Sequence, residues 1–227
     1  MKPITKSVKS PKAMATSSLS KKGRILLNIV VFASGRGSNF KAIYENIEAG
    51  VLTNVEVSLV LSDKPDANVL KYAEEKGINH VCVDRKAYDS QADYEKELLR
   101  QVQGVPMNLL VLAGYMRIIG EDFLNNVGVP VVNIHPSLLP AFTGLHAQKQ
   151  AVDYGVKVSG CTVHFVDAEL DHGPIIAQVP VPVHDDDDED SLSARILEQE
   201  HQIYTVCLQL IADHKVTIEN RQVKIKK

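Results

Sequence analysis

An asparagine and a histidine stand two residues apart at the end of a short apolar segment. Residues 131–135 read V-V-N-I-H, so on a strand Asn133 and His135 point to the same face. Pro136 follows and ends the strand, which places the pair where open α/β sheets bind ligands. An amide donor beside an imidazole suits a carbonyl that becomes an oxyanion. Taken alone, so short a pattern is more often a polar strand end, and its interpretation depends on the rest of the chain.

A glycine-rich turn follows the first apolar segment. Residues 25–33 predict a buried parallel strand, the turn reads S-G-R-G-S-N (residues 34–39), and a helix with an apolar face follows. This arrangement aims free N–H groups at an anion. The loop lacks a Walker pattern, and Phe40 occupies the place of the third glycine in a dinucleotide fingerprint. The turn therefore suits a single phosphate monoester, although a plain tight turn explains the motif equally well.

The remaining segments alternate between strands and helices, which indicates a doubly wound, mostly parallel sheet of the Rossmann-like kind. After residues 131–135 we expect an antiparallel strand extension and a long terminal helix that begins near Ser191. The further predicted strands cover 55–61, 80–83, 108–113, 159–166 and 174–183, and the predicted helices cover 67–76, 89–103 and 147–154.

Three acidic features need an interpretation. Asp63 ends the second predicted strand, and we interpret it as a turn residue. Glu200 falls on the apolar stripe of the last helix, where a carboxylate should have a partner or a ligand. The acidic run at 185–190 lacks the ligand spacing of a calcium loop and is interpreted as a solvated loop.

The charges are distributed unevenly along the 227 residues. Residues 1–24 hold seven Lys and Arg and no acid, and we expect a disordered, dispensable leader before a single domain at 25–227. The rest carries 18 basic and 28 acidic residues, which argues against nucleic-acid binding. No apolar run approaches the ~18 residues of a membrane span. Three scattered cysteines form no disulfide or zinc pattern and favour a reducing compartment. We expect a cytoplasmic protein, or an organellar one if the leader is a transit peptide.

Four segments together resemble one enzyme family. The segments N-I-H-P-S-L-L-P, L-A-G-Y-M-R-I-I, H-F-V-D-A-E-L-D-H-G-P and S-G-R-G-S-N are similar, in order and spacing, to the glycinamide ribonucleotide formyltransferases. The resemblance covers about residues 27–215. It implies transfer of a formyl group from 10-formyltetrahydrofolate, as co-substrate, to the amino group of glycinamide ribonucleotide in the third step of purine biosynthesis.

The resemblance also implies roles for individual residues. It matches Asn133, His135 and Asp171 to the catalytic amide, imidazole and carboxylate. It matches Gly37, Ser38, Asn39 and Glu200 to the ribonucleotide site, with Glu200 on the ribose hydroxyls. It matches Met116, Arg117, Ile118, Ile119, Ala168, Glu169, Leu170, His172 and Gly173 to the folate site, and His146 to the histidine of G-L-H.

Some alternatives stay open at this point. A hydrolase that releases formate from the same folate would use the same catalytic set, and a dinucleotide-dependent oxidoreductase is a weaker alternative. His164 and His172 lie near the predicted site, but their spacing matches no metal motif, so we expect no metal. We expect small-molecule substrates, no nucleic-acid or membrane partner, and a monomer or homodimer.

Overall fold

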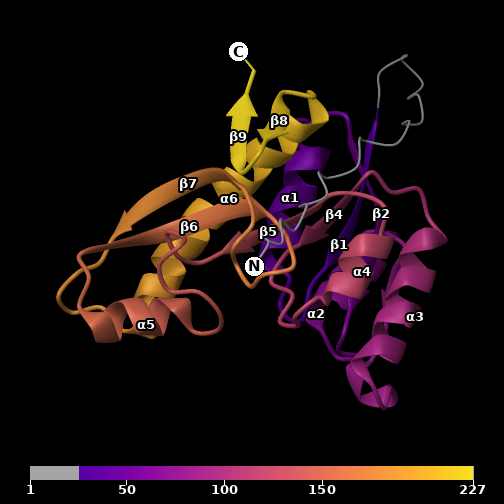
Figure 1. Cartoon of the computed structure of the whole chain (residues 1–227), viewed down its shortest axis with the longest axis horizontal. Coiled ribbons are helices and arrows are strands. Elements are labelled where there is room, and N and C mark those ends of the chain that lie inside the picture. Colours follow the sequence, from indigo (N-terminus) through magenta and orange to yellow (C-terminus); the bar gives the residue numbers. More distant parts are fainter. Residues whose placement is uncertain (1–25, 227) are drawn as a thin grey trace, which may run out of the picture.

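The computed structural model describes residues 26–226, so the predicted leader at 1–24 lies outside the described residues. The main sheet consists of β1 (Leu27–Phe32), β2 (Val55–Ser62), β3 (His80–Cys82), β4 (Leu109–Leu112), β5 (Val131–His135), β6 (Val158–Phe165) and β7 (Ile175–Pro182). Their order is β3-β2-β1-β4-β5-β6-β7 (Figure 1). Strands β1 to β5 pair in parallel, whereas β6 is antiparallel to both β5 and β7. The predicted sheet and its antiparallel extension are confirmed.

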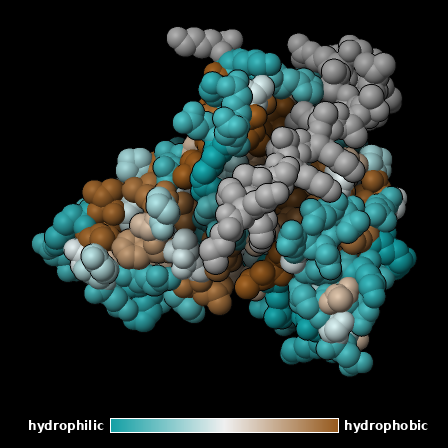
Figure 2. Space-filling model, in the orientation of Figure 1, coloured by the Kyte–Doolittle hydropathy of each residue, from teal (hydrophilic) through white to brown (hydrophobic). Residues whose placement is uncertain are grey.

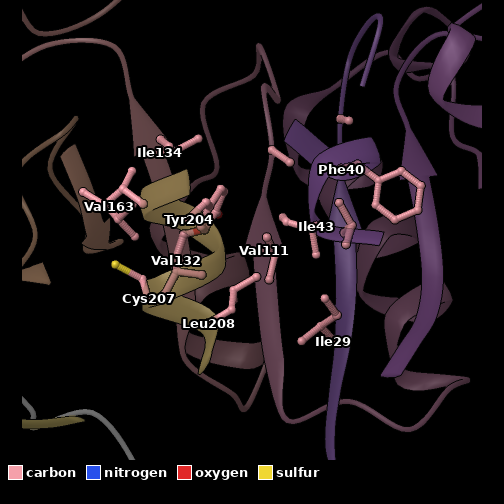
Figure 3. Packing of buried hydrophobic residues seen from close by; sticks show 14 of the residues in the cluster. Ile29, Phe40, Ile43, Val111, Val132, Ile134, Val163, Tyr204, Cys207 and Leu208 are labelled. Carbon is pink, nitrogen blue, oxygen red and sulfur yellow. The ribbon is translucent and has the colours of Figure 1, made fainter. Parts of the chain in front are cut away.

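Helices cover both faces of this sheet. They are α1 (Ser38–Glu48), α2 (Asn68–Glu75), α3 (Gln91–Gln103), α4 (Glu121–Asn126), α5 (Ala147–Tyr154) and α6 (Glu189–Ala212). Alternate residues of β1 point to opposite faces of the sheet and enter two separate parts of the core. Ile29 packs with side chains of α1, α2 and α6, and Val30 packs with side chains of α3 and α4. On the α6 side, Tyr204, Cys207 and Leu208 point toward the strands (Figure 3). The buried Tyr204 hydroxyl donates to the carbonyls of Leu112 and Val132, at 2.9 and 3.2 Å.

Residues 185–188 of the acidic run form a mostly exposed turn, in keeping with the predicted loop, and Glu189 and Asp190 are the first residues of α6. Asp188 is the N-cap, and a capping box joins its side chain and backbone to Ser191. Asp187 accepts two hydrogen bonds from the Arg195 guanidinium at 2.7 and 2.8 Å, and this contact holds the pKa of Asp187 well below its usual range. These contacts fix the residue at which the helix begins.

Three short elements were not predicted. Helix α4 lies on the α3 side of the sheet, a 3-10 turn spans Arg85–Ala87, and a two-stranded hairpin of β8 (Val216–Glu219) and β9 (Gln222–Ile225) follows α6. The hairpin turn uses Asn220 in the left-handed region, with φ 57°. Val216 and Val223 pack this hairpin against the core beside β7.

The carboxyl ends of β1, β4 and β5 meet at the point where the strand order reverses. There the backbone N–H of Ser34 donates to the carbonyl of Gly114 at 3.0 Å, and the Ser34 hydroxyl accepts from the N–H of Met116 at 2.8 Å. The loops after β1 and β4 are thereby joined at the expected position of a ligand site. Figure 2 shows mostly hydrophilic side chains over α3 and more hydrophobic ones toward the middle of the molecule. Among residues 26–226, no helix is both long and apolar enough to cross a membrane.

Candidate active site

Asn133 and His135 point from β5 toward the same face, as predicted, and β6 adds a second histidine beside them. His164 lies directly opposite Asn133 in the antiparallel ladder, and the Asn133 amide Nδ2 donates to His164 Nε2 at 3.3 Å. His164 Nδ1 lies 2.9 Å from the carbonyl of Phe165, which accepts only if Nδ1 carries the proton. Burial lowers the pKa of His164 and thereby favours the neutral ring that can accept from Asn133. The amide is therefore oriented by a neutral imidazole.

His135 lies between two acceptors. Its Nε2 is 2.8 Å from the carbonyl of Phe142, and its Nδ1 is 3.3 Å from Asp171 Oδ2. Only 5% of the His135 side chain and 9% of the Asp171 side chain are exposed, so water screens the pair weakly. The backbone N–H of Gly144 donates to the same Asp171 oxygen at 2.7 Å. Because both ring nitrogens face acceptors, the contacts of His135 are completed when both nitrogens carry protons.

Backbone strain brings the loop atoms to this histidine. Phe142 and Asp171 both lie in the left-handed region, with φ 51° and 50°. Such a conformation is uncommon for a bulky residue such as Phe and recurs at functional sites. At the end of the Asp171 loop, a Cβ on Gly173 would lie 1.9 Å from the carbonyl oxygen of Phe165. Only a glycine permits this close approach, which returns the chain from the loop to β7.

A buried polar network supports the segment between His135 and Phe142. The Thr162 hydroxyl of β6 donates to the carbonyl of Ser137 at 2.7 Å and accepts from the N–H of Leu139 at 3.1 Å. The Ser137 hydroxyl donates to the carbonyl of Ala141 at 2.5 Å. Gln178 of β7 donates to the carbonyl of Leu139 at 2.9 Å. Three residues of the segment, Ser137, Leu139 and Ala141, are thus tied to each other or to β6 and β7, which fixes the carbonyl that faces His135.

Asn39 and Glu200 form a second cluster, although they are 161 positions apart in the sequence. The Asn39 Nδ2 donates to Glu200 Oε2 at 2.8 Å, and both residues are buried. Burial raises the pKa of Glu200 to about 6, against the smaller lowering effect of the Asn39 hydrogen bond. The Asn39 Oδ1 is buried with no protein partner. This cluster therefore holds an acceptor and a carboxyl group that a hydroxylated ligand could satisfy.

Gly37 is the N-cap of α1 and adopts φ 72°. A Cβ added there would lie 2.5 Å from Cγ2 of Val69 at the start of α2. The turn therefore requires glycine for its own packing, independently of any bound anion. Ser38 is the first residue of α1, so its N–H lies among the free donors of the helix N-terminus.

The residues matched to a folate site differ in their environment. Met116, Ile118 and Leu170 expose 59%, 71% and 55% of their surface, which is unusual for large apolar side chains. The side chain of Arg117 instead donates from Nε to Asp63 Oδ2 at 2.7 Å. Asp63 lies in the bend after β2, in keeping with its interpretation as a turn residue, and it is also buried and forms an ion pair with Arg117.

The remaining predicted residues belong to the loop that carries Asp171 or to the segment after β4, with one exception. Ala168, Glu169 and His172 are exposed, Gly173 is buried and Ile119 is partly buried. The exception is His146, whose exposed ring lies 3.0 Å from Glu189 at the start of α6. Within the part of the chain that the structure describes, no group of three or more His, Cys, Asp or Glu residues is placed to hold a metal ion.

Sequence reasoning missed two interactions in this region: the contact of His164 with Asn133 and the ion pair of Asp63 with Arg117. His164 was considered only as a metal ligand, although its position on β6 gave a signal: in the expected antiparallel pair it had to lie beside β5. The Asp63–Arg117 pair had no local signal, because 54 residues separate its members.

Comparisons with known proteins agree with this geometry. The sequence pattern of the formyl transferase family matches residues 27–208. The chain is 40% identical over 190 residues to phosphoribosylglycinamide formyltransferase of Escherichia coli (strain K12), with 84% of this chain and 89% of that protein covered. It is 42% identical over 174 residues to the Bacillus subtilis (strain 168) enzyme of the same name, with 77% and 89% covered.

A solved structure shows the same fold. Glycinamide ribonucleotide transformylase 1 from Symbiobacterium toebii superposes with a TM-score of 0.85 at 42% identity, with 89% of this chain and 95% of that chain covered. The resemblance found in the sequence is thus confirmed over the segment that contains both clusters. The chain belongs to the formyl transferase family, and its relatives within that family are the phosphoribosylglycinamide formyltransferases.

Proposed function

We propose that Asn133, His135 and Asp171 transfer the formyl group of 10-formyltetrahydrofolate to the amino group of glycinamide ribonucleotide. Members of the formyl transferase family use formyltetrahydrofolate as co-substrate. The observation that carries the proposal is the placement of His135, with Asp171 Oδ2 at 3.3 Å and the oriented amide of Asn133 on the same face of β5.

Asn133 and His135 act on the formyl oxygen. As the ribonucleotide amine attacks the formyl carbon, the carbon–oxygen double bond becomes a single bond and its oxygen gains a negative charge. The Asn133 amide keeps its bond to His164 and donates its second N–H to this oxyanion, and a protonated His135 donates from Nε2 in place of its contact with the Phe142 carbonyl. Because His164 and Asp171 already orient the two donors, little reorganisation is needed when the charge develops.

Asp171 stabilises the imidazolium and guides the proton of the amine. The tetrahedral intermediate collapses when the bond between the formyl carbon and the folate nitrogen breaks. The proton lost by the attacking amine reaches that nitrogen, through Asp171 and water. The products are the formamide of the ribonucleotide and tetrahydrofolate, with atoms and charge balanced.

The ribonucleotide occupies the second cluster. Its phosphate lies at the N-terminus of α1, where Gly37, Ser38 and Asn39 place backbone donors near the positive end of the helix. Its ribose hydroxyls donate to Glu200. This role explains why the protein buries a carboxyl group that, within residues 26–226, accepts a single side-chain hydrogen bond, from Asn39.

The folate ring lies against the loop after β4 and the loop that carries Asp171. The exposed side chains of Met116, Ile118 and Leu170 offer an apolar surface, which suits a flat heteroaromatic ring. Arg117 and Ile119 flank this surface, and Ala168, Glu169, His172 and Gly173 complete the loop. The proposed mechanism needs no metal, because the oxyanion donors and the proton route are supplied by these side chains.

One assay separates this function from a formate-releasing hydrolase. Consumption of 10-formyltetrahydrofolate is followed with and without glycinamide ribonucleotide, together with release of formate. We expect turnover only when the ribonucleotide is present, and no turnover in a His135→Asn variant. His80→Asn, which alters an exposed histidine on β3, is the matched control. Equal turnover without the ribonucleotide, with formate released, would identify the hydrolase instead.

A further inference from the structure

The C-terminal hairpin lies beside the loop that carries Asp171, and it follows the last residue that the family pattern matches. The family pattern ends at residue 208, whereas β8 and β9 span Val216–Glu219 and Gln222–Ile225. Val216 and Val223 seat the hairpin on the core, and β9 runs close to β7 (Figure 1). Lys226 N–H donates to the carbonyl of Lys215 at 2.8 Å and extends the ladder. The hairpin is thus packed on the body and can serve as a fixed support.

The turn of this hairpin contacts the loop directly. Arg221 Nη2 donates to the backbone carbonyl of His172, the residue that follows Asp171. Arg221 Nη1 lies 3.1 Å from Nδ1 of the same histidine. The His172 ring also lies 2.9 Å from Asp167 Oδ2 and 3.9 Å from Glu169 Oε2. A cationic side chain therefore meets a loop end that carries two acids and a backbone acceptor, which favours the contact.

The loop has reason to need such a support. Residues 168–170 are exposed, and Asp171 is held in the left-handed region at φ 50°. On the inner side, Asp171 is fixed by the Gly144 N–H at 2.7 Å. On the outer side, Arg221 bonds the carbonyl of the following residue, His172, in the peptide group that joins His172 to Gly173. If either restraint were removed, the Asp171 carboxylate would move away from its position 3.3 Å from His135 Nδ1.

We propose that Arg221 is a positioning residue for the formyl transfer: its bond to the His172 carbonyl holds the 167–173 loop so that Asp171 faces His135. The effect on the reaction rests on the proposed function of Asp171, whereas the effect on the loop does not. The inference extends the functional unit beyond residue 208, into the hairpin of β8 and β9.

The test compares Arg221→Ala with Lys224→Ala in the full chain. Lys224 lies on the same hairpin, but its side chain pairs with Glu219 of β8, so it controls for changes to the hairpin itself. Hydrogen exchange of the backbone amides at 166–174 measures the loop without substrates. We expect exchange to be about 10-fold faster in Arg221→Ala and unchanged in Lys224→Ala, with equal melting temperatures.

Kinetics then test the link to the reaction. In Arg221→Ala we expect kcat/KM for the folate to fall by about 5- to 10-fold, with an unchanged Kd for the ribonucleotide. Arg221→Lys should recover part of this loss, because an ammonium group can also donate to a carbonyl. In an Asp171→Asn background the Arg221→Ala change should lower kcat no further, because both act through one carboxylate.

The outcomes separate cleanly. Loop exchange and kinetics equal to those of Lys224→Ala would overturn the proposal. Faster loop exchange with unchanged kinetics would overturn the positioning role. A lower melting temperature together with weaker ribonucleotide binding would show that Arg221 supports the fold in general. That result would also overturn the proposal. If the wild-type protein has no transferase activity, the proposed function fails, while the exchange measurement still decides whether Arg221 holds the loop.

Discussion

Two carboxyl groups with little exposed surface, those of Asp171 and Glu200, differ in how the free protein surrounds them. Asp171 has a backbone N–H at 2.7 Å and an imidazole nitrogen at 3.3 Å, so its charge already has partners in the free protein. Glu200 has one neutral amide at 2.8 Å, and burial raises its pKa to about 6. The first carboxylate is thus ready before a substrate arrives, whereas the second lacks the donors that would stabilise its charge.

The difference matches the role that we propose for each group. A group that stabilises charge in a transition state must be oriented in advance, because reorientation during the reaction would add to the barrier. A group that recognises hydroxyls gains affinity when its unmet hydrogen bonds are completed by the ligand. The contrast predicts that changes at Asp171 affect turnover and that changes at Glu200 affect ribonucleotide binding. Substitutions at Asp171, Glu200 and His164 test this division, and a substitution at Gly37 tests the packing of the turn before α1.

Asp171→Asn should have the largest effect. It keeps the size of the side chain but removes the charge that faces His135 and the route for the proton. We expect kcat to fall by at least ~10³-fold, while the Kd values of both substrates change far less. Steady-state kinetics and calorimetric binding give the two numbers. Turnover within a few-fold of wild type would remove Asp171 from the catalytic set and contradict its proposed contrast with Glu200.

Gly37→Ala should come next, and its effect should appear in stability. The Cβ would lie 2.5 Å from Val69 Cγ2 at a backbone φ of 72°. We expect a loss of ~2–4 kcal/mol in the free energy of unfolding, from overpacking plus the left-handed conformation. Gly35→Ala is the matched control, because no atom lies within 4 Å of its Cβ position. Its stability should change by less than ~1 kcal/mol. Equal stabilities for the two variants would contradict the packing role of Gly37.

Glu200→Gln should alter the pH dependence of stability. The folded state raises the pKa of Glu200 from 4.5 to about 6, so between these values the folded protein binds more protons than the unfolded one. The free energy of unfolding should therefore decrease as pH rises through this window, by ~2 kcal/mol. Denaturant titrations of wild type and Glu200→Gln from pH 4 to 7 should diverge by this amount.

The same variant also tests recognition. Glu200→Gln should raise the Kd for the ribonucleotide by ~10-fold or more, because a charged acceptor for the hydroxyls is lost. Folate binding should remain unchanged. Parallel pH profiles would contradict the raised pKa of Glu200. Equal losses for both substrates would contradict the division between the two clusters.

Replacement of His164 should have the smallest effect. His164→Leu removes the acceptor at 3.3 Å from the Asn133 amide, and that amide would then lose its fixed orientation. We expect a fall in kcat of ~10-fold. His164→Gln retains an acceptor and should lie between this variant and wild type. If Leu and Gln give the same turnover, the hydrogen bond from Asn133 has no role in the reaction.

The sequence predicted the features that depend on local pattern. The apolar run at 25–33, the N-x-H pair and the alternation of strands with helices determined the sheet, because burial on both faces leaves a periodic signature. The two-strand extension followed from two further apolar segments joined by a glycine-containing loop.

The missed features depend on contacts or on weak local signals. The Asp63–Arg117 pair forms only when the ends of β2 and β4 come together in the sheet. The hairpin 216–225 shows alternation around Asn220, but the segment is short and no strands were predicted there. The orienting role of His164 required the register of β5 against β6, which neither strand fixes alone.

The capped start of α6 sets the direction in which Glu200 points. Asp188 and Ser191 fix the first turn, and Glu200 lies three turns further along an uninterrupted helix. Each residue turns an α-helix by about 100°, so one residue inserted or deleted between the cap and Glu200 would rotate the carboxyl group away from Asn39 by that angle. The acids at 185–190 therefore determine the rotational position of every later residue of α6. A shift of one residue at this cap would separate Glu200 from Asn39 without altering either side chain.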